Sequence, residues 1–136
     1  AILRREVPQL SREGNQWRLN VEGRELLVVA DPGSDRMRVF SPIGDAQSVE
    51  PEQILRMMVA NFHTSLDARY AFIGDGTVVA LYLHPLSSLQ ERDLRSALRQ
   101  VAELANTFGT TYSSGDMLFG PGTRPGNANP RETDVI

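Results

Sequence analysis

The chain has 136 residues, a net charge of −3 and no cysteine, so we expect one domain without disulfides or thiolate metal sites. Apolar residues make up 40% of the chain, which suits a globular fold, and no apolar run reaches the roughly 18 residues of a membrane span. The acidic balance argues against nucleic-acid binding, because phosphates require a concentrated positive surface. A cytoplasmic location fits these features best.

The first third of the chain predicts an antiparallel meander of three strands. The sequence "WRLNV", 17–21, alternates apolar and polar residues, as a half-buried strand does. "RELLVVA", 24–30, is apolar and branched, as a central strand should be, and "RMRVFS", 36–41, alternates again. The turn-forming sequences "EG" and "DPGSD" separate the three strands. Residues 1–16 are polar and predict at most a short helix or an added edge segment.

A helix is predicted for "PEQILRMMVANF", 51–62, after Pro42 and Gly44 break the sheet. Pro51 suits the first helical position. Five residues share one broad apolar face by their helical spacing: Ile54, Leu55, Met58, Val59 and Phe62. Met57 widens this face beyond what a single sheet should cover, so we expect the helix to meet another subunit as well. The alternative is a helix that lies wholly inside the core.

Residues 68–83 predict a β-hairpin, in which Asp75 and Gly76 form a tight two-residue turn. The last long element is a helix over residues 87–109, with Gly109 at its end. Two residue pairs can form a capping box at its start, Ser87 with Gln90 or Ser88 with Glu91.

The order of elements is therefore β-β-β-α-β-β-α. It predicts an α+β fold, with an antiparallel sheet of about five strands and helices packed on one face. From residue 110 onward, glycine and proline become frequent. We expect a single α+β domain over residues 1–109, followed by a Gly/Pro-rich C-terminal extension over residues 110–136.

One cluster contains the residue types of a catalytic site: His63, Ser65 and Asp67. Residues this close in sequence rarely reach triad geometry, and a helix end followed by a turn explains them better. A small hydrolase that uses His63 with Ser65 or Asp67 is the last-ranked hypothesis. The two histidines, His63 and His84, lack a metal-ligand spacing, and no phosphate-loop motif occurs. We therefore expect no catalytic residues, no metal and no cofactor.

Residues 17–109 resemble the type III secretion chaperone-like superfamily, which includes the CesT (Tir chaperone) and YbjN-type proteins. The order and lengths of the elements carry the resemblance. "RMRVFSPIGDA" resembles the third strand and following loop of the family, and "PEQILRMMVANF" resembles its middle helix. "AFIGDGTVVALYLHPLSSL" resembles the last hairpin, and "LQERDLRSALRQVAELANTF" the closing helix. The family usually begins with an amphipathic helix, whereas this chain begins with a segment interrupted by Pro8.

The resemblance implies a small, acidic homodimer without enzymatic activity. We also expect a bacterial protein that has neither a nucleic acid nor a membrane as its partner. In the secretion chaperones, the middle helix builds the dimer, and apolar grooves on the sheet and first helix hold an extended client segment. The dimer role carries over to four residues of this chain: Leu55, Met58, Val59 and Phe62. The alternative is a regulatory or structural interaction protein of the YbjN type, without an extended client.

Overall fold

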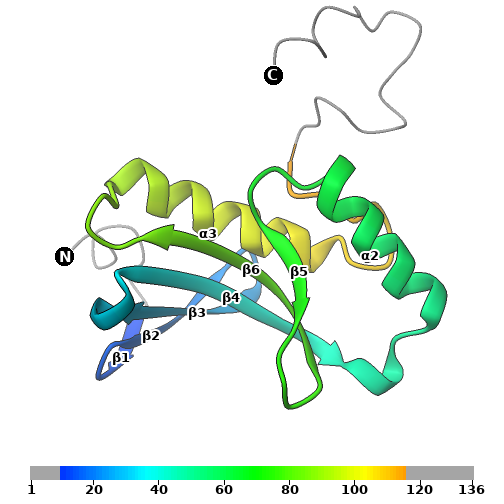
Figure 1. Ribbon diagram of the computed structural model, residues 1–136, viewed down its shortest axis with the longest axis horizontal. Coiled ribbons are helices and arrows are strands. Elements are labelled where there is room, and N and C mark those ends of the chain that lie inside the picture. Colours follow the sequence, from blue (N-terminus) through cyan, green and yellow to red (C-terminus); the bar gives the residue numbers. More distant parts are fainter. Residues whose placement is uncertain (1–9, 116–136) are drawn as a thin grey trace, which may run out of the picture.

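Six strands form one antiparallel sheet in the computed structural model, which describes residues 10–115 (Figure 1). The strands are β1 (Leu10–Glu13), β2 (Gln16–Val21), β3 (Arg24–Asp31), β4 (Arg36–Asp45), β5 (Arg69–Phe72) and β6 (Thr77–Pro85). The helices are α2 (Pro51–His63) and α3 (Glu91–Asn106), with two short 3-10 turns, η1 (Pro32–Ser34) and η2 (Ala46–Ser48). The strand order is β1-β2-β3-β4-β6-β5. The expectations for residues 1–9 and 116–136 lie outside the described residues.

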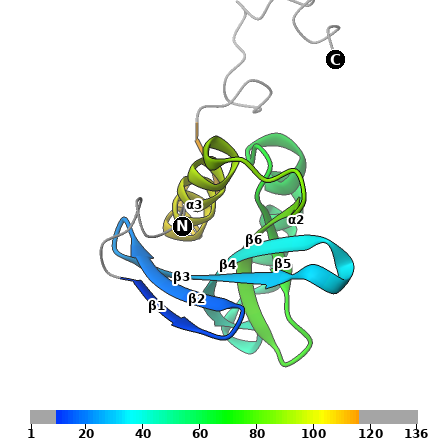
Figure 2. The same ribbon diagram turned by 90° about the vertical axis from the view of Figure 1, so that its left-hand side faces the viewer.

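Both helices lie on the same face of the twisted sheet (Figure 2). The predicted α+β class, antiparallel sheet and one-sided helices are therefore confirmed, with six strands in place of about five. The additional strand is β1, which pairs with β2 and places Leu10 opposite Leu19. Its sequence LSRE is polar because an edge strand is largely exposed to water. The alternation that marks a half-buried strand is therefore missing from it.

Strand β4 continues through Pro42 and Gly44, so the prediction that these residues break the sheet is wrong. The register between β4 and β6 shifts between Pro42 and Gly44, and pairing then resumes to Asp45. Such a bulge accommodates a proline inside a strand, because it interrupts the hydrogen-bond ladder locally. The long β4–β6 pairing carries the sheet toward the start of α2.

The β5–β6 connection is one residue longer than the predicted two-residue turn. Ile73 N–H donates to the Thr77 carbonyl at 2.8 Å, and Gly76 N–H donates to the Ile73 carbonyl at 2.9 Å. Three residues therefore lie between Ile73 and Thr77, and Gly76 has a φ of +98°. A glycine in this left-handed region is typical of three-residue hairpin loops, because it has no Cβ to clash.

Helix α3 begins later than predicted, and neither predicted capping box forms. The N-cap is Gln90, whose backbone N–H donates to the carboxylate of Asp93 at 3.0 Å. The backbone N–H and hydroxyl of Ser87 instead donate to the carboxylate of Asp35, at 2.7 and 2.8 Å. These hydrogen bonds hold the pKa of Asp35 below its ordinary value. They also tie the β3–β4 turn to the entry of α3.

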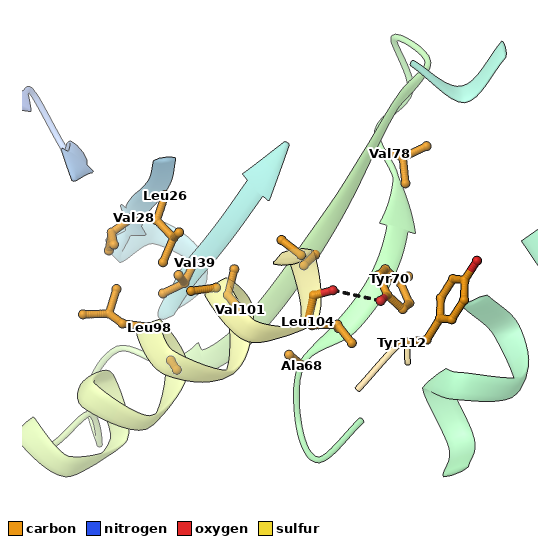
Figure 3. Packing of buried hydrophobic residues seen from close by; sticks show 14 of the residues in the cluster. Leu26, Val28, Val39, Ala68, Tyr70, Val78, Leu98, Val101, Leu104 and Tyr112 are labelled. Atoms are coloured by element: carbon orange, nitrogen blue, oxygen red, sulfur yellow. Dashed lines mark hydrogen bonds between the residues drawn. The ribbon is translucent and has the colours of Figure 1, made fainter. Parts of the chain in front are cut away.

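The core lies between the sheet and the two helices (Figure 3). The labelled side chains that fill it are Leu26, Val28, Val39, Ala68, Tyr70, Val78, Leu98, Val101, Leu104 and Tyr112. The Tyr70 hydroxyl donates to the Leu104 carbonyl at 2.8 Å, and burial raises the pKa of this tyrosine. Tyr112 packs edge-to-face on Tyr70, with ring centroids 6.0 Å apart. Residues 110–115, the described part of the predicted extension, therefore pack against the core.

The C-terminal end of α3 is capped by a side chain from the start of β3. The Arg24 guanidinium donates to the Ala105 carbonyl and to the Asn106 side chain, both at 3.1 Å. Because a cation complements the negative end of a helix, we expect Arg24→Gln to lower the free energy of unfolding by about 1 kcal/mol. Urea denaturation measures this loss. Arg99→Gln, at an exposed position of α3, is the control. Equal losses in both variants would contradict a capping role.

Candidate functional site

Helix α2 is fixed to the rest of the molecule by few contacts. Its fully buried side chains are Met57 and Ala60, and Met57 has no exposed surface. Beside them, the side-chain amide of Asn61 bonds to the backbone of β5. Its Oδ1 accepts from the Tyr70 N–H at 2.8 Å, and its Nδ2 donates to the Tyr70 carbonyl at 3.2 Å. These contacts set the rotation of the helix about its own axis.

The opposite side of α2 carries an exposed apolar stripe. The exposed fractions are 64% for Leu55, 52% for Met58, 46% for Val59 and 78% for Phe62. We call these four residues the α2 stripe; their spacing of i, i+3, i+4 and i+7 places them on one helix face. Leu66, just past the helix end, is exposed as well. Exposed apolar side chains gathered on one face are typical of interaction sites.

The structure changes the interpretation of the two sides of α2. The predicted broad face, apart from the partly buried Ile54, points away from the core, and Met57, predicted to widen that face, is the core contact. The alternative of a helix wholly inside the core is wrong. The role of the α2 stripe in a dimer stays a prediction.

The His63, Ser65 and Asp67 cluster forms the corner between α2 and β5. The Ser65 hydroxyl donates to the Ala60 carbonyl at 3.1 Å and accepts from the Arg69 guanidinium at 3.2 Å. The carboxylate of Asp67 accepts from a side-chain amide of α3, that of Gln100, at 3.0 Å. The His63 ring packs edge-to-face on Phe62. Ser65 and Asp67 thus bind groups that hold the corner in shape.

Sequence reasoning missed Gln100, the buried residue that holds this corner on α3. Its side-chain oxygen accepts from the N–H groups of Asp67 and Ala68, at 2.8 and 3.0 Å. Its side-chain NH₂ donates to Asp67 and to Ser96. Gln100 lies three residues after the buried Ala97, so a polar residue at an apolar position of the helix was the available signal.

Metal-binding residues do not gather within residues 10–115, where no group of three or more His, Cys, Asp or Glu could hold an ion. His84 lies beside the Pro85 carbonyl, with its Nδ1 2.8 Å from the oxygen, and its Nε2 is 3.7 Å from Asp93. The same part of the chain contains no helix that is long and apolar enough to cross a membrane.

The sheet face opposite the helices carries a second group of apolar side chains. Strand register places Leu27 beside Phe40 and Phe40 beside Leu81. The next row contains Val29, Arg38 and Leu83, in the same order of strands. We call these six residues the open sheet face, because both described helices lie on the other side (Figure 2). Leu83 is 52% exposed and Arg38 is exposed, which makes this second row accessible to a partner, whereas Leu27 of the first row is buried.

No protein-family model matches the chain, and no curated protein matches it. Several solved structures have a similar fold. A chain of the HopA1–SchA chaperone–effector complex has a TM-score of 0.59 at 10% identity, covering 78% of this chain and 84% of that chain. The Yersinia pestis type III secretion chaperone SycH, solved in complex with a stable fragment of YscM2, gives a TM-score of 0.59 at 12% identity, covering 79% and 92%.

The ExoT–SpcS complex from Pseudomonas aeruginosa gives a TM-score of 0.55 at 18% identity, covering 79% of this chain and 89% of that chain. At identities this low, the likeness concerns the fold. The chain has the type III secretion chaperone-like fold, as the order of its elements predicts.

Proposed function

We propose that this chain, whose fold is that of the type III secretion chaperones, is a non-enzymatic, cytoplasmic protein-binding module that forms a homodimer and holds an extended segment of a client protein. The observation that carries the proposal is the exposed α2 stripe. The likeness to chaperones solved in complex with effector or partner proteins supports the client-holding part.

The α2 stripe is suited to pairing with its own copy. In a two-fold dimer the same patch occurs on both subunits, so an apolar helix face is complementary to itself. Removing a Leu, Met, Val or Phe side chain from water contributes about 1.5–3 kcal/mol, and each protomer offers four such side chains. The flexible thioether of Met58 can adapt to the shape of the partner surface. Burial of the stripe would therefore favour association.

The dimer is tested by Met58→Arg, which places a charge in the centre of the stripe. We expect the variant to be a monomer, because an unpaired charge is costly to bury in an apolar interface. Light scattering coupled to size exclusion measures the mass, and circular dichroism checks the fold. The control is Ser88→Arg, which adds the same charge at an exposed position between β6 and α3. A dimeric Met58→Arg variant, or a monomeric parent protein, would contradict the proposed interface.

The YbjN-type alternative differs in having no extended client. The open sheet face favours client binding over this alternative, because the exposed Leu83 and the partly exposed Phe40 and Leu81 lie on it, outside the proposed dimer interface. The hydrolase hypothesis has less support, since the Ser65 hydroxyl donates to a helix carbonyl and Asp67 binds Gln100.

A further inference from the structure

The open sheet face combines apolar side chains with one positively charged side chain, that of Arg38, which forms no ion pair within the described residues 10–115. One row across β3, β4 and β6 is apolar and contains Leu27, Phe40 and Leu81. In the adjacent row, Arg38 lies between Val29 and Leu83. Within residues 10–115, the exposed Arg38 side chain makes no hydrogen bond or ion pair. Its neighbours in the row therefore offer it no carboxylate.

The other arginines near this face are already engaged. The Arg18 guanidinium pairs with Glu25 at 2.8 Å, and Arg36 donates to the Asp35 carbonyl at 2.8 Å. Arg69 donates to three acceptors at the α2–β5 corner: Ser65, Leu66 and Ala68. Arg38 thus differs from these three arginines in making no hydrogen bond or ion pair within residues 10–115.

We propose that the open sheet face docks an extended segment in which an acidic residue follows an apolar residue at a spacing of two, with the carboxylate on Arg38. The inference rests on the proposed client-holding function and adds the face and the chemistry of the client. The side chains on one side of an extended chain repeat every 6.5–7 Å or so, which matches the distance between successive rows of a sheet. A segment lying along β4 therefore places one side chain over Phe40 and the next over Arg38.

Two other occupants fit this face less well. A nucleic acid would require a concentrated positive surface, whereas the apolar row of this face offers no cation and the chain has a net charge of −3. A second copy docked by two-fold symmetry about the centre of the face would bring Arg38 near its own equivalent, and like charges oppose each other. A segment that combines acidic and apolar residues can place a carboxylate on Arg38 and pack its apolar side chains on the surrounding ones.

The test uses two short fluorescent peptides, one repeating Leu-Thr-Glu-Thr and one with lysine in place of glutamate. Fluorescence anisotropy measures their affinity for the full-length protein. We expect the acidic peptide to bind more tightly, and Arg38→Glu to weaken its binding about fivefold while strengthening the lysine peptide. Leu83→Ser should weaken both peptides, because it removes an apolar contact that they share. Arg99→Glu, which makes the same charge change on α3, should leave both affinities unchanged.

The outcomes separate this inference from the proposed function. If Arg38→Glu and Arg99→Glu have equal effects, net charge explains the binding, and the site on the sheet is wrong while client holding stands. If neither peptide binds the folded protein, the inference fails, while the proposed dimer is judged separately by the Met58→Arg variant. If Leu83→Ser lowers the mass measured by light scattering, a second copy covers the face and the inference is overturned. Circular dichroism confirms that each variant is folded.

Discussion

Met57→Ala is expected to lower the free energy of unfolding by about 2–5 kcal/mol, whereas Met58→Ala should change it by less than about 0.5 kcal/mol within a single protomer. The two methionines are neighbours in sequence, yet Met57 is fully buried and Met58 is 52% exposed. Truncating Met57 removes its contacts in the core and leaves a cavity beneath α2. Met58 is half exposed, so truncating it leaves no cavity in the core and mainly removes the contacts expected with a partner over the stripe.

Urea denaturation over a series of protein concentrations separates the two effects. A loss that comes from association depends on concentration by mass action, while a loss in the core does not. The Met57→Ala effect should therefore persist on dilution, and any Met58→Ala effect should disappear. Similar losses in both variants at the lowest concentration would contradict the orientation of α2.

The second large effect is expected at Gln100. Gln100→Leu should lower the free energy of unfolding by about 2–3 kcal/mol, because it leaves the backbone N–H groups of Asp67 and Ala68 without their acceptor. Leucine has a similar volume, so the lost hydrogen bonds dominate over packing. Urea denaturation measures the difference. A variant as stable as the parent protein would show that the hydrogen bonds of Gln100 contribute nothing to stability.

Gln100→Glu is the matched variant, since it keeps the acceptor oxygen but removes the NH₂ group that donates to Asp67. Near neutral pH, two carboxylates would face each other at this contact. Their repulsion raises the pKa of the pair in the folded state above the unfolded value. The variant should therefore approach the parent stability below about pH 4 and lose stability as the pH rises through the range in which both carboxyls ionise. The parent protein, which has the neutral Gln100 opposite Asp67, should not lose stability in this way as the pH rises.

Most elements of the fold were predictable because their signals are local. Strands β2 and β4 alternate since one side of each packs under the helices, and β3 is apolar since it lies centrally. The wrong predictions concern residues whose interaction partners are distant in the sequence. Pro42 interrupts a strand locally, but the long β6 pairs on both sides of it across a bulge. Ser87 has the spacing of a cap, but it binds Asp35, which is 52 residues away in sequence.

The apolar stripe of α2 was also predictable, since periodicity places its residues on one face. Periodicity does not say which of two apolar sides meets the core. The larger side chains of the stripe face outward, while Met57 and the small Ala60 face inward. The Asn61 contact with Tyr70, between helix and edge strand, accompanies this orientation and is invisible to hydrophobic patterning. The unpaired charge of Arg38 likewise depends on neighbours that only the sheet brings together.

The Asn61 contact has a consequence for how the sheet can grow. Strand β5 is at the edge of the sheet, and an open edge is a template on which further strands can add, including those of aggregates. At Tyr70 the side-chain amide of Asn61 supplies the donor and acceptor that an added strand would supply. The N–H and carbonyl of Tyr70 are already hydrogen-bonded, so an added strand would first have to displace the Asn61 amide. A partner that meets the molecule beside α2 is therefore directed to join through side chains and not by extending the β-ladder.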